Sequence, residues 1–292
     1  MNLVISYIVR FFIKLFAIVP FRLLYFFSDL LYLILYKLLK YRLSVVRSNL
    51  SQSFPEKSAV ELGRLERLSY RNLADITVES LKAFTMTKEQ IFSRHKVINE
   101  EILSHLYDKC GGIIALPNHY GNWEWGAMSC MQLPWPGVAL YKPLSNKQLD
   151  SYIRKNRSRL GTLLKSIYQT ARVFVETKDK KFNFVMAADQ SPSNPKKAHW
   201  VDFLGRKTAF LHGPELYARK YNYPVVFVDI QRVKRGYYEL SLSILSENHG
   251  ELKDGELTRR LASKLEEVIR KKPEDWLWSH KRWKLKYEGK TL

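Results

Sequence analysis

The chain has 292 residues, of which 46% are hydrophobic, and its 48 Lys and Arg against 28 Asp and Glu give a formal net charge of +20. This composition excludes a disordered chain, and the two cysteines, Cys110 and Cys130, have neither metal-ligand nor disulfide-framework spacing, which favours a reducing compartment. The charge favours an anionic partner, which can be a nucleic acid, an anionic membrane surface or a phosphorylated or acidic substrate.

The first 40 residues are rich in Leu, Ile, Val, Phe and Tyr, with basic residues interspersed. The longest stretch without a basic residue, 23–36, is shorter than the roughly 20 apolar residues that span a bilayer. A small-residue cleavage site does not follow, so a signal peptide is not expected. The pattern predicts an N-terminal apolar helical membrane anchor over residues 1–40, either spanning or lying in the interface, with a buried helix pair as the alternative.

The rest of the chain, residues 41–292, is expected to form the catalytic domain. Leucines at helical spacing between residues 41 and 87 predict one or two long helices. Strands are expected at residues 112–116, 137–141, 182–188, 224–230 and 237–245, and helices at 122–131, 147–164, 213–220 and 255–272. This alternation predicts an α/β fold with a largely parallel central sheet flanked by helices.

His119 and Glu124 stand five residues apart, just after the first predicted strand. On a continuous helix this spacing would point them apart, but Gly121 and Asn122 indicate a turn that lets them meet, with Asn122 capping the next helix. A histidine held by a carboxylate is a general base, whereas a histidine that only caps a loop is the alternative. The chain contains no Gly-x-Ser-x-Gly elbow, so an acyl-serine route has no obvious nucleophile.

Further candidates lie near strand ends, where open α/β sheets bind their ligands. Arg157 and Arg159 belong to a basic cluster that can hold phosphate or stabilise an oxyanion, or can form a solvated helix face. Asp189 and Gln190 follow a predicted strand. Asp189 can orient a loop near the site or reflect simple turn chemistry.

Five segments of the chain resemble the lipid A biosynthesis acyltransferase family, the late or secondary acyltransferases of lauroyl or myristoyl type. In chain order they are residues 118–124 (NHYGNWE), 141–143 (YKP), 188–190 (ADQ), 203–205 (FLG) and 276–283 (WLWSHKRW). The resemblance implies a membrane-bound O-acyltransferase that moves a fatty acyl chain from acyl carrier protein, or acyl-CoA, to a hydroxyl of a lipid A precursor. It also implies the inner membrane, with the catalytic domain facing the cytoplasm.

The same resemblance implies roles for single residues. The family's His-x4-Asp/Glu motif falls on His119 as general base and Glu124 as its orienting partner, and a later catalytic arginine falls on Arg157 or Arg159. Substrate-binding roles fall on Asn118, Asn122, Lys142, Asp189 and Gln190. Lys142 stands where the family often has arginine, which puts the acceptor in question because lysine lacks the bidentate fork.

The expected partners are the acyl donor, an anionic glycolipid acceptor and the membrane, without a metal or cofactor. The alternatives are the same chemistry on another glycolipid, an aminolipid or a lysophospholipid, or a non-catalytic basic membrane-binding protein. No basic stretch matches a nucleic-acid module, so specific nucleic-acid binding is not expected. The sequence leaves open the donor, the acyl-chain length and the hydroxyl that is acylated.

Overall fold

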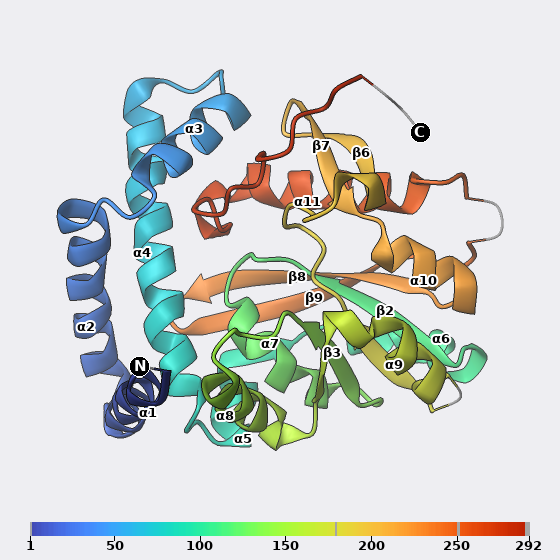
Figure 1. Cartoon of the computed structure of the whole chain (residues 1–292), viewed down its shortest axis with the longest axis horizontal. Coiled ribbons are helices and arrows are strands. Elements are labelled where there is room, and N and C mark those ends of the chain that lie inside the picture. Colours follow the sequence, from blue (N-terminus) through green and yellow to red (C-terminus); the bar gives the residue numbers. More distant parts are fainter. Residues whose placement is uncertain (1, 179, 250–251, 290–292) are drawn as a thin grey trace.

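The computed structural model describes residues 2–178, 180–249 and 252–289. A seven-stranded sheet in the order β1-β9-β8-β2-β5-β3-β4 forms the centre (Figure 1). Its strands are β1 (His95–Val97), β2 (Gly112–Pro117), β3 (Gly137–Tyr141), β4 (Leu163–Ser166), β5 (Phe182–Val185), β8 (Val225–Lys234) and β9 (Tyr237–Ser246). A separate antiparallel pair joins β6 (Ala198–Phe203) to β7 (Arg206–Leu211).

Helices pack around the central sheet (Figure 1). The α-helices are α1 (Asn2–Ile18), α2 (Phe21–Leu33), α3 (Leu43–Ser53), α4 (Ala59–Ala83), α5 (Lys88–Arg94), α6 (Ser104–Lys109), α7 (Trp123–Ser129), α8 (Lys147–Arg157), α9 (Thr170–Thr177), α10 (Gly213–Tyr221) and α11 (Glu256–Lys271). A π-helical turn, η1 (Ile34–Leu38), continues α2. The 3₁₀ turns are η2 (Glu100–Leu103), η3 (Cys130–Gln132), η4 (Ser158–Leu160), η5 (Ile167–Gln169), η6 (Pro195–Lys197) and η7 (Pro273–Asp275).

The direction of two strands corrects the predicted fold class. Strands β8, β2, β5, β3 and β4 run parallel, but β9 pairs antiparallel with β8, and β1 pairs parallel with β9. The sheet is therefore mixed, although the fold is α/β and most of the sheet is parallel. The cause is the connection between β8 and β9, which is only Arg235 and Gly236, with Gly236 at a φ of 76°. A parallel pair would need a crossover of a dozen or more residues.

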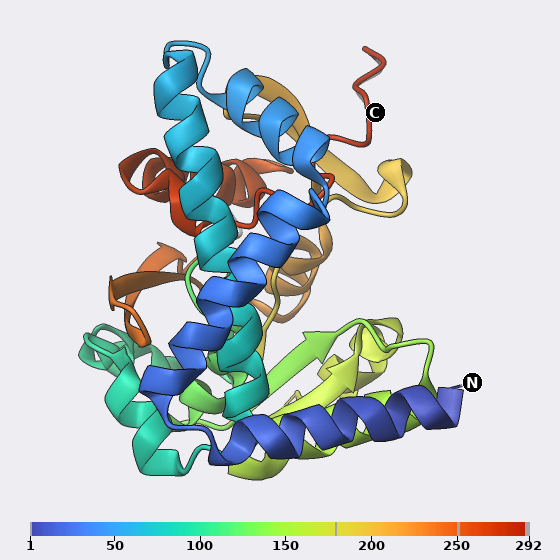
Figure 2. The same ribbon diagram turned by 90° about the vertical axis from the view of Figure 1, so that its left-hand side faces the viewer.

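The prediction of an N-terminal membrane anchor was wrong. Pro20 divides the apolar segment into α1, of 17 residues, and α2, of 13 residues. Within the described parts of the chain, every helix is too short or too polar to cross a membrane. Figure 2 shows α2 lying beside α4, where Tyr25 and Ser28 donate hydrogen bonds to Glu79 and Asp75, at 2.9 and 2.6 Å. Because these polar partners lie on another helix, the apolar pattern of residues 1–40 did not reveal the packing.

Helix α4 links the N-terminal helices to the centre of the molecule through Glu79. The Glu79 side chain is fully buried, and burial raises the pKa of its carboxyl to about 7. Its oxygens accept hydrogen bonds from Tyr25 of α2, from Tyr238 of β9 and from Asn122, which precedes α7. One buried side chain therefore fixes α2, β9 and the start of α7 relative to α4.

Most predicted strands are confirmed to within a few residues, because their apolar runs are bounded by Gly or Pro. The helix predicted over residues 147–164 was too long. Helix α8 ends at Arg157, and Gly161, at a φ of 102°, turns the chain into β4. Strands β1, β4, β6 and β7 were not predicted. Strands β1 and β4 have only three and four residues, and charged residues interrupt the apolar pattern of β6 and β7.

Candidate active site

The loop after β2 places His119 at the carboxyl end of a strand near the middle of the sheet. Asn122 caps α7 as predicted, since its side-chain oxygen accepts a hydrogen bond from Trp125 N at 3.2 Å. The Asn122 amide nitrogen donates to Glu79 Oε2 at 2.6 Å. Both ends of the Asn122 side chain are therefore used to hold α7. Its contact with substrate stays a prediction.

The carboxylate of Asp189, which follows β5, holds His119. Asp189 Oδ1 accepts a hydrogen bond from His119 Nδ1 at 2.7 Å, and Oδ2 accepts one from the His119 backbone N at 2.9 Å. Trp276 Nε1 donates to Oδ2 at 3.0 Å. The Asp189 side chain is only 1% exposed, whereas that of His119 is 20% exposed. Asp189 therefore lies behind the ring and fixes its orientation, in agreement with the interpretation that Asp189 orients a loop near the site. Its contact with substrate stays a prediction.

The charges of this pair determine the tautomer of His119. Burial disfavours an ionised Asp189, but the His119 ring and the hydrogen bonds from His119 and Trp276 outweigh it and lower the pKa of the carboxyl to about 2. An ionised carboxylate only accepts hydrogen bonds, so Nδ1 carries a proton and Nε2 of the neutral ring has the free lone pair. Burial lowers the pKa of His119, but the Asp189 carboxylate reverses this effect and raises that pKa above its ordinary value.

Glu124 lies in the first turn of α7, as predicted, but the predicted orienting position at His119 Nδ1 is occupied by Asp189. Its carboxylate accepts a hydrogen bond from Arg157 Nη2 at the end of α8, and the two side chains are 25% and 30% exposed. Glu124 is close enough to His119 to raise the pKa of the ring, as a smaller effect after that of Asp189. The structure therefore groups His119 and Asp189 as one pair, and Glu124 and Arg157 as a second pair beside it.

The other predicted site residues lie in different surroundings. Arg159 Nη2 donates to the backbone oxygens of Ala83, at 2.6 Å, and Met86, and so ties η4 to the end of α4. Lys142 is exposed after β3, and Gln190 is partly exposed beside Asp189. Asn118 is 2% exposed, and its Oδ1 has no hydrogen-bond partner within the described residues. Of the two candidate arginines, only Arg157 pairs with a residue of the His119 motif.

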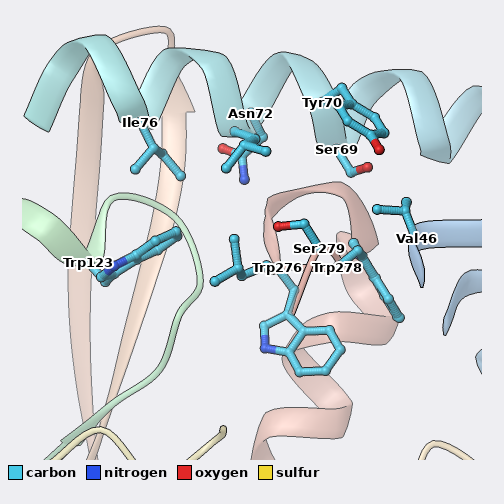
Figure 3. Close-up of a pocket in the computed structure, with 11 residues that line it drawn as sticks. Val46, Ser69, Tyr70, Asn72, Ile76, Trp123, Trp276, Trp278 and Ser279 are labelled. Carbon is cyan, nitrogen blue, oxygen red and sulfur yellow. The ribbon is translucent and has the colours of Figure 1, made fainter. Parts of the chain in front are cut away.

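A pocket with about 270 Å³ of empty space, part of it open to solvent, is lined by Trp123 and Trp276, which contact His119 and Asp189 respectively. Figure 3 shows Trp123 and Trp276 facing it, with Asn72 and Ile76 of α4 opposite. The Trp123 ring packs against the His119 ring, with their centroids 5.3 Å apart and their planes at 57°. The other lining residues are Val46, Ser69, Tyr70, Leu73, Leu277, Trp278 and Ser279. Indole faces next to hydroxyl and amide groups suit a ligand with both apolar and polar surfaces.

Comparison with known proteins identifies the family. The model of the bacterial lipid A biosynthesis acyltransferase family matches residues 1–285. The chain belongs to this family. It is 25% identical over 262 residues to the lipid A biosynthesis lauroyltransferase of Escherichia coli K12, which covers 87% of this chain and 82% of that protein. It is 24% identical over 259 residues to the lipid A biosynthesis palmitoleoyltransferase of the same organism, with the same coverage. As the resemblance implied, it is an acyltransferase of lipid A biosynthesis.

Two tryptophans, Trp276 and Trp123, have roles in the site of this lipid A acyltransferase that the sequence did not predict. Trp276 belongs to one of the segments that resemble the family, but its hydrogen bond to Asp189 was not predicted. Trp123 lies inside the predicted motif, but its packing against His119 was not anticipated. A local pattern could have indicated Trp123, because it is the first residue of the helix that Asn122 caps. Trp276 lies 87 residues from Asp189, and no short motif signals that contact.

A second cluster of side chains in this lipid A acyltransferase consists of a histidine and two carboxylates, which are common metal ligands. Ligand atoms of His199, Glu215 and Asp254 lie within 4.8 Å of one another. The Glu215 oxygens, however, already accept hydrogen bonds from the backbone N of Gly255 and of Thr258, at 2.8 and 3.0 Å. Glu215 therefore caps the start of α11, and we assign no metal to this cluster.

Replacing Gly121 by alanine is expected to damage the loop that carries His119. Gly121 has a φ of 56°, and a Cβ there would lie 2.3 Å from the backbone oxygen of Ile230. The left-handed conformation and the clash together should lower the free energy of unfolding, measured in urea, by roughly 2–5 kcal/mol. A displacement of His119 by about 1 Å should reduce the rate of transfer by about 100-fold.

Gly205→Ala is the matched control for this prediction. Gly205 also has a positive φ, of 74°, but a Cβ there would have no heavy atom within 4 Å. It should show the conformational cost of about 1–2 kcal/mol without the clash and without the loss of activity. Equal losses in the two variants would mean that the contact with Ile230 does not position the loop.

Proposed function

We propose that this chain is a membrane-associated O-acyltransferase that moves a fatty acyl group from a thioester donor to a hydroxyl of a lipid A precursor. The observation that carries this proposal is the Asp189–His119 pair, because it holds a part-exposed imidazole by Nδ1 and leaves the Nε2 lone pair available, next to the indoles that line a pocket. Such a ring can deprotonate a hydroxyl near neutral pH. The family membership supports a lipid A-type acceptor.

In the proposed reaction, the acceptor hydroxyl gives its proton to His119 Nε2 as its oxygen attacks the thioester carbonyl. Arg157 has five N–H donors, so that, besides the one given to Glu124, it can donate to the oxyanion that forms. The oxyanion then reforms the carbonyl, the C–S bond breaks, and the His119 proton passes to the departing sulfur. Asp189 stabilises the charged ring between these two proton transfers.

A covalent acyl-cysteine intermediate is not part of this proposal. Burial raises the pKa of the Cys130 thiol to about 12 and also raises that of Cys110. Both side chains therefore stay protonated near neutral pH, and a protonated thiol is a weak nucleophile. This favours direct transfer between the two bound substrates.

The proposed donor is acyl carrier protein, with acyl-CoA as the other candidate, and the proposed place is the cytoplasmic face of the inner membrane. A lipid acceptor resides in a bilayer, whereas a carrier-bound donor is soluble, so the reaction needs a surface where both meet. The formal net charge of +20 supports this arrangement, because it attracts an acidic carrier, a phosphorylated acceptor and an anionic bilayer before specific contacts form.

The test is a transfer assay with purified protein, fatty acyl thioesters of carrier protein and of CoA, and a set of acceptors, with products identified by mass. The acceptors are a lipid A precursor, another glycolipid, an aminolipid and a lysophospholipid. The His119→Gln variant is the blank. Transfer to the lipid A precursor by the wild type alone is expected. If the protein transfers the acyl chain only to another acceptor, the proposed mechanism stands but the lipid A precursor is not its substrate. If the folded protein transfers the chain to none of the acceptors, the proposal is wrong.

Arg157→Ala is expected to lower the transfer rate but not the stability, whereas Arg159→Ala is expected to lower the stability but not the transfer rate. Arg157 pairs with Glu124 beside His119, so its loss should reduce transfer by about 10²–10³-fold, as for a removed oxyanion donor. Because this pair is partly exposed, its loss should change the stability by less than about 0.5 kcal/mol. Arg159 donates to Ala83 O and Met86 O, so its loss should cost about 1–3 kcal/mol of stability.

Turnover and urea denaturation of both variants check this prediction. In Arg159→Ala the transfer rate should stay within about threefold of the wild type at a temperature where the variant is folded, because Arg159 bonds to the backbone of α4 and its following turn rather than to the His119 motif. A large loss of turnover in Arg159→Ala with none in Arg157→Ala would reverse the assignment.

A further inference from the structure

Two hydrogen bonds to a single residue of α4, Glu79, attach α7 to the rest of the molecule. The side-chain amide of Asn122, which caps α7, donates to the Glu79 carboxylate, and Trp125 Nε1 donates to the Glu79 backbone oxygen at 3.0 Å. All three residues are fully buried. Because α7 begins at Trp123 and carries Glu124 in its first turn, Glu79 fixes the place of that turn relative to α4.

The first turn of α7 carries two side chains that lie beside the base. The Trp123 ring packs against the His119 ring, and the Glu124 carboxylate accepts a hydrogen bond from Arg157. The His119 ring itself is held by a different contact, with Asp189. The attachment of α7 to α4 therefore determines where the carboxylate meets the guanidinium, rather than the orientation of the base.

The Glu79 carboxyl is an unusual anchor, because no cation in the described parts of the chain forms an ion pair with it. Its hydrogen bonds come from neutral donors. Oε2 accepts from Asn122 Nδ2 at 2.6 Å and from the Tyr238 hydroxyl at 2.8 Å, and Oε1 accepts from the Tyr25 hydroxyl at 2.9 Å. The charge of Arg232 favours the ionised form, but burial outweighs it and raises the pKa of the carboxyl to about 7. Buried groups with shifted pKa values are concentrated at functional sites.

We propose that Glu79 is a positioning residue for acyl transfer, which acts through Asn122 on the first turn of α7. That turn sets where Glu124 meets Arg157, and the proposal rests on the proposed function, in which this arginine donates to the oxyanion. Loss of the bond between Glu79 and Asn122 releases the cap of α7, whereas the Trp125 bond is made to backbone and keeps the helix attached. A misplacement of about 1 Å costs about 100-fold in rate.

The test exchanges the donor and the acceptor between the two side chains. Asn122→Asp places a second carboxylate against that of Glu79, and the repulsion should lower kcat by about 100-fold with little change in KM. The double variant Asn122→Asp with Glu79→Gln restores a bond, from the new amide to the new carboxylate, and aspartate still caps a helix. Its kcat should recover to within about threefold of the wild type, because the two positions are coupled.

Tyr25→Phe is the matched control, because it removes another bond to the same carboxylate and leaves that of Asn122 in place. It should lower the free energy of unfolding in urea but leave kcat unchanged. Two further variants replace Asn122→Asp if that protein does not fold. Glu79→Leu removes the acceptor and should lower kcat by about 100-fold. Glu79→Gln alone should keep kcat, since its oxygen can face Asn122 while the Tyr25 hydroxyl accepts from its amide.

Two results would overturn the proposal. If the double variant stays as slow as Asn122→Asp, Glu79 does not act through this residue, and a direct contact of Asn122 with substrate is supported instead, since the fully buried Glu79 cannot reach a substrate. If Tyr25→Phe loses as much kcat as Asn122→Asp, the role of Glu79 is only structural. Transfer is measured with whichever acceptor the wild type acylates, so that an acceptor other than the lipid A precursor would reject the proposed function and leave this test intact.

Discussion

Replacing His119 by glutamine is expected to lower the kcat/KM of acyl transfer by about 10³-fold, the middle of the range for general-base catalysis. Glutamine is polar and of similar size, and it can accept a hydrogen bond, but it cannot take a proton near neutral pH. Its side chain can still bond to Asp189, so the free energy of unfolding should change little. The measurement is single-turnover transfer at saturating donor, which separates the chemical step from binding.

His105→Gln is the matched control for this prediction. His105 is an exposed histidine whose Nε2 bonds to Glu247 at 3.0 Å. It should keep the wild-type rate and so exclude a general effect of removing a histidine from a basic protein. A His119→Gln protein that retains more than about a tenth of the wild-type rate would show that another group accepts the proton, and the mechanism would have to be abandoned.

Replacing Asp189 by asparagine is expected to lower the kcat/KM of acyl transfer by a similar or larger factor, about 10³–10⁴. The amide would donate a hydrogen bond to His119 Nδ1 where the carboxylate accepted one, which forces the ring hydrogen onto Nε2 and removes the lone pair that the proposed mechanism uses as the base. The amide oxygen can still accept from Trp276 Nε1, so the site should keep its shape. The expected result is therefore a low rate with nearly unchanged binding.

The pH dependence provides a second measurement for the same variant. Asp189 raises the pKa of His119, so wild-type activity should fall as the pH drops through a value above 6.5, where the base becomes protonated. In Asp189→Asn the raising effect is absent, and the acid limb of the residual activity should move to lower pH. Asp202→Asn, at an exposed carboxylate paired with Lys207, should leave the profile unchanged. If the acid limb of the pH–activity profile stays at the same pH in Asp189→Asn, Asp189 does not raise the pKa of His119.

The same pair predicts how site stability depends on pH. The pKa of Asp189 is lowered to about 2, so its contribution is present above the unfolded value near 3.9 and is lost as the pH falls through about 2. The pKa of His119 is raised, so its contribution is complete below about 6.5 and is lost as the pH rises through the higher folded value. Both contributions are therefore complete between about pH 3.9 and pH 6.5, where the pair stabilises the fold most.

Local signals were sufficient to predict the loop that carries the base. A strand that ends at Pro117, a glycine in the turn and an asparagine that caps the next helix are all neighbours in sequence. The structure confirms this strand–turn–helix arrangement around His119. Such features are predictable because the interactions that form them span only a few residues.

The partner of His119 could not be predicted in the same way. Glu124 lies five residues away in sequence, whereas Asp189 is 70 residues away. Asp189 reaches His119 because β2 and β5 are neighbours in the sheet and run parallel, so that their carboxyl ends meet. Strand order is a property of the whole fold, and a pattern read along one strand does not contain it. The mistaken N-terminal anchor has the same cause, since Ser28 finds its partner on α4.

The segment around Trp276 has a consequence for how the protein becomes active during synthesis. Besides the indole bond to Asp189, Asp275 O accepts from Gly121 N, and Leu277 N donates to His119 O, at 3.0 Å each. The two backbone bonds join residues more than 150 positions apart, and a ribosome adds residues from the N-terminus onward. A nascent chain shorter than about 277 residues therefore lacks the groups that complete the site. The nascent enzyme should therefore stay inactive until Leu277 has been added and has left the ribosome.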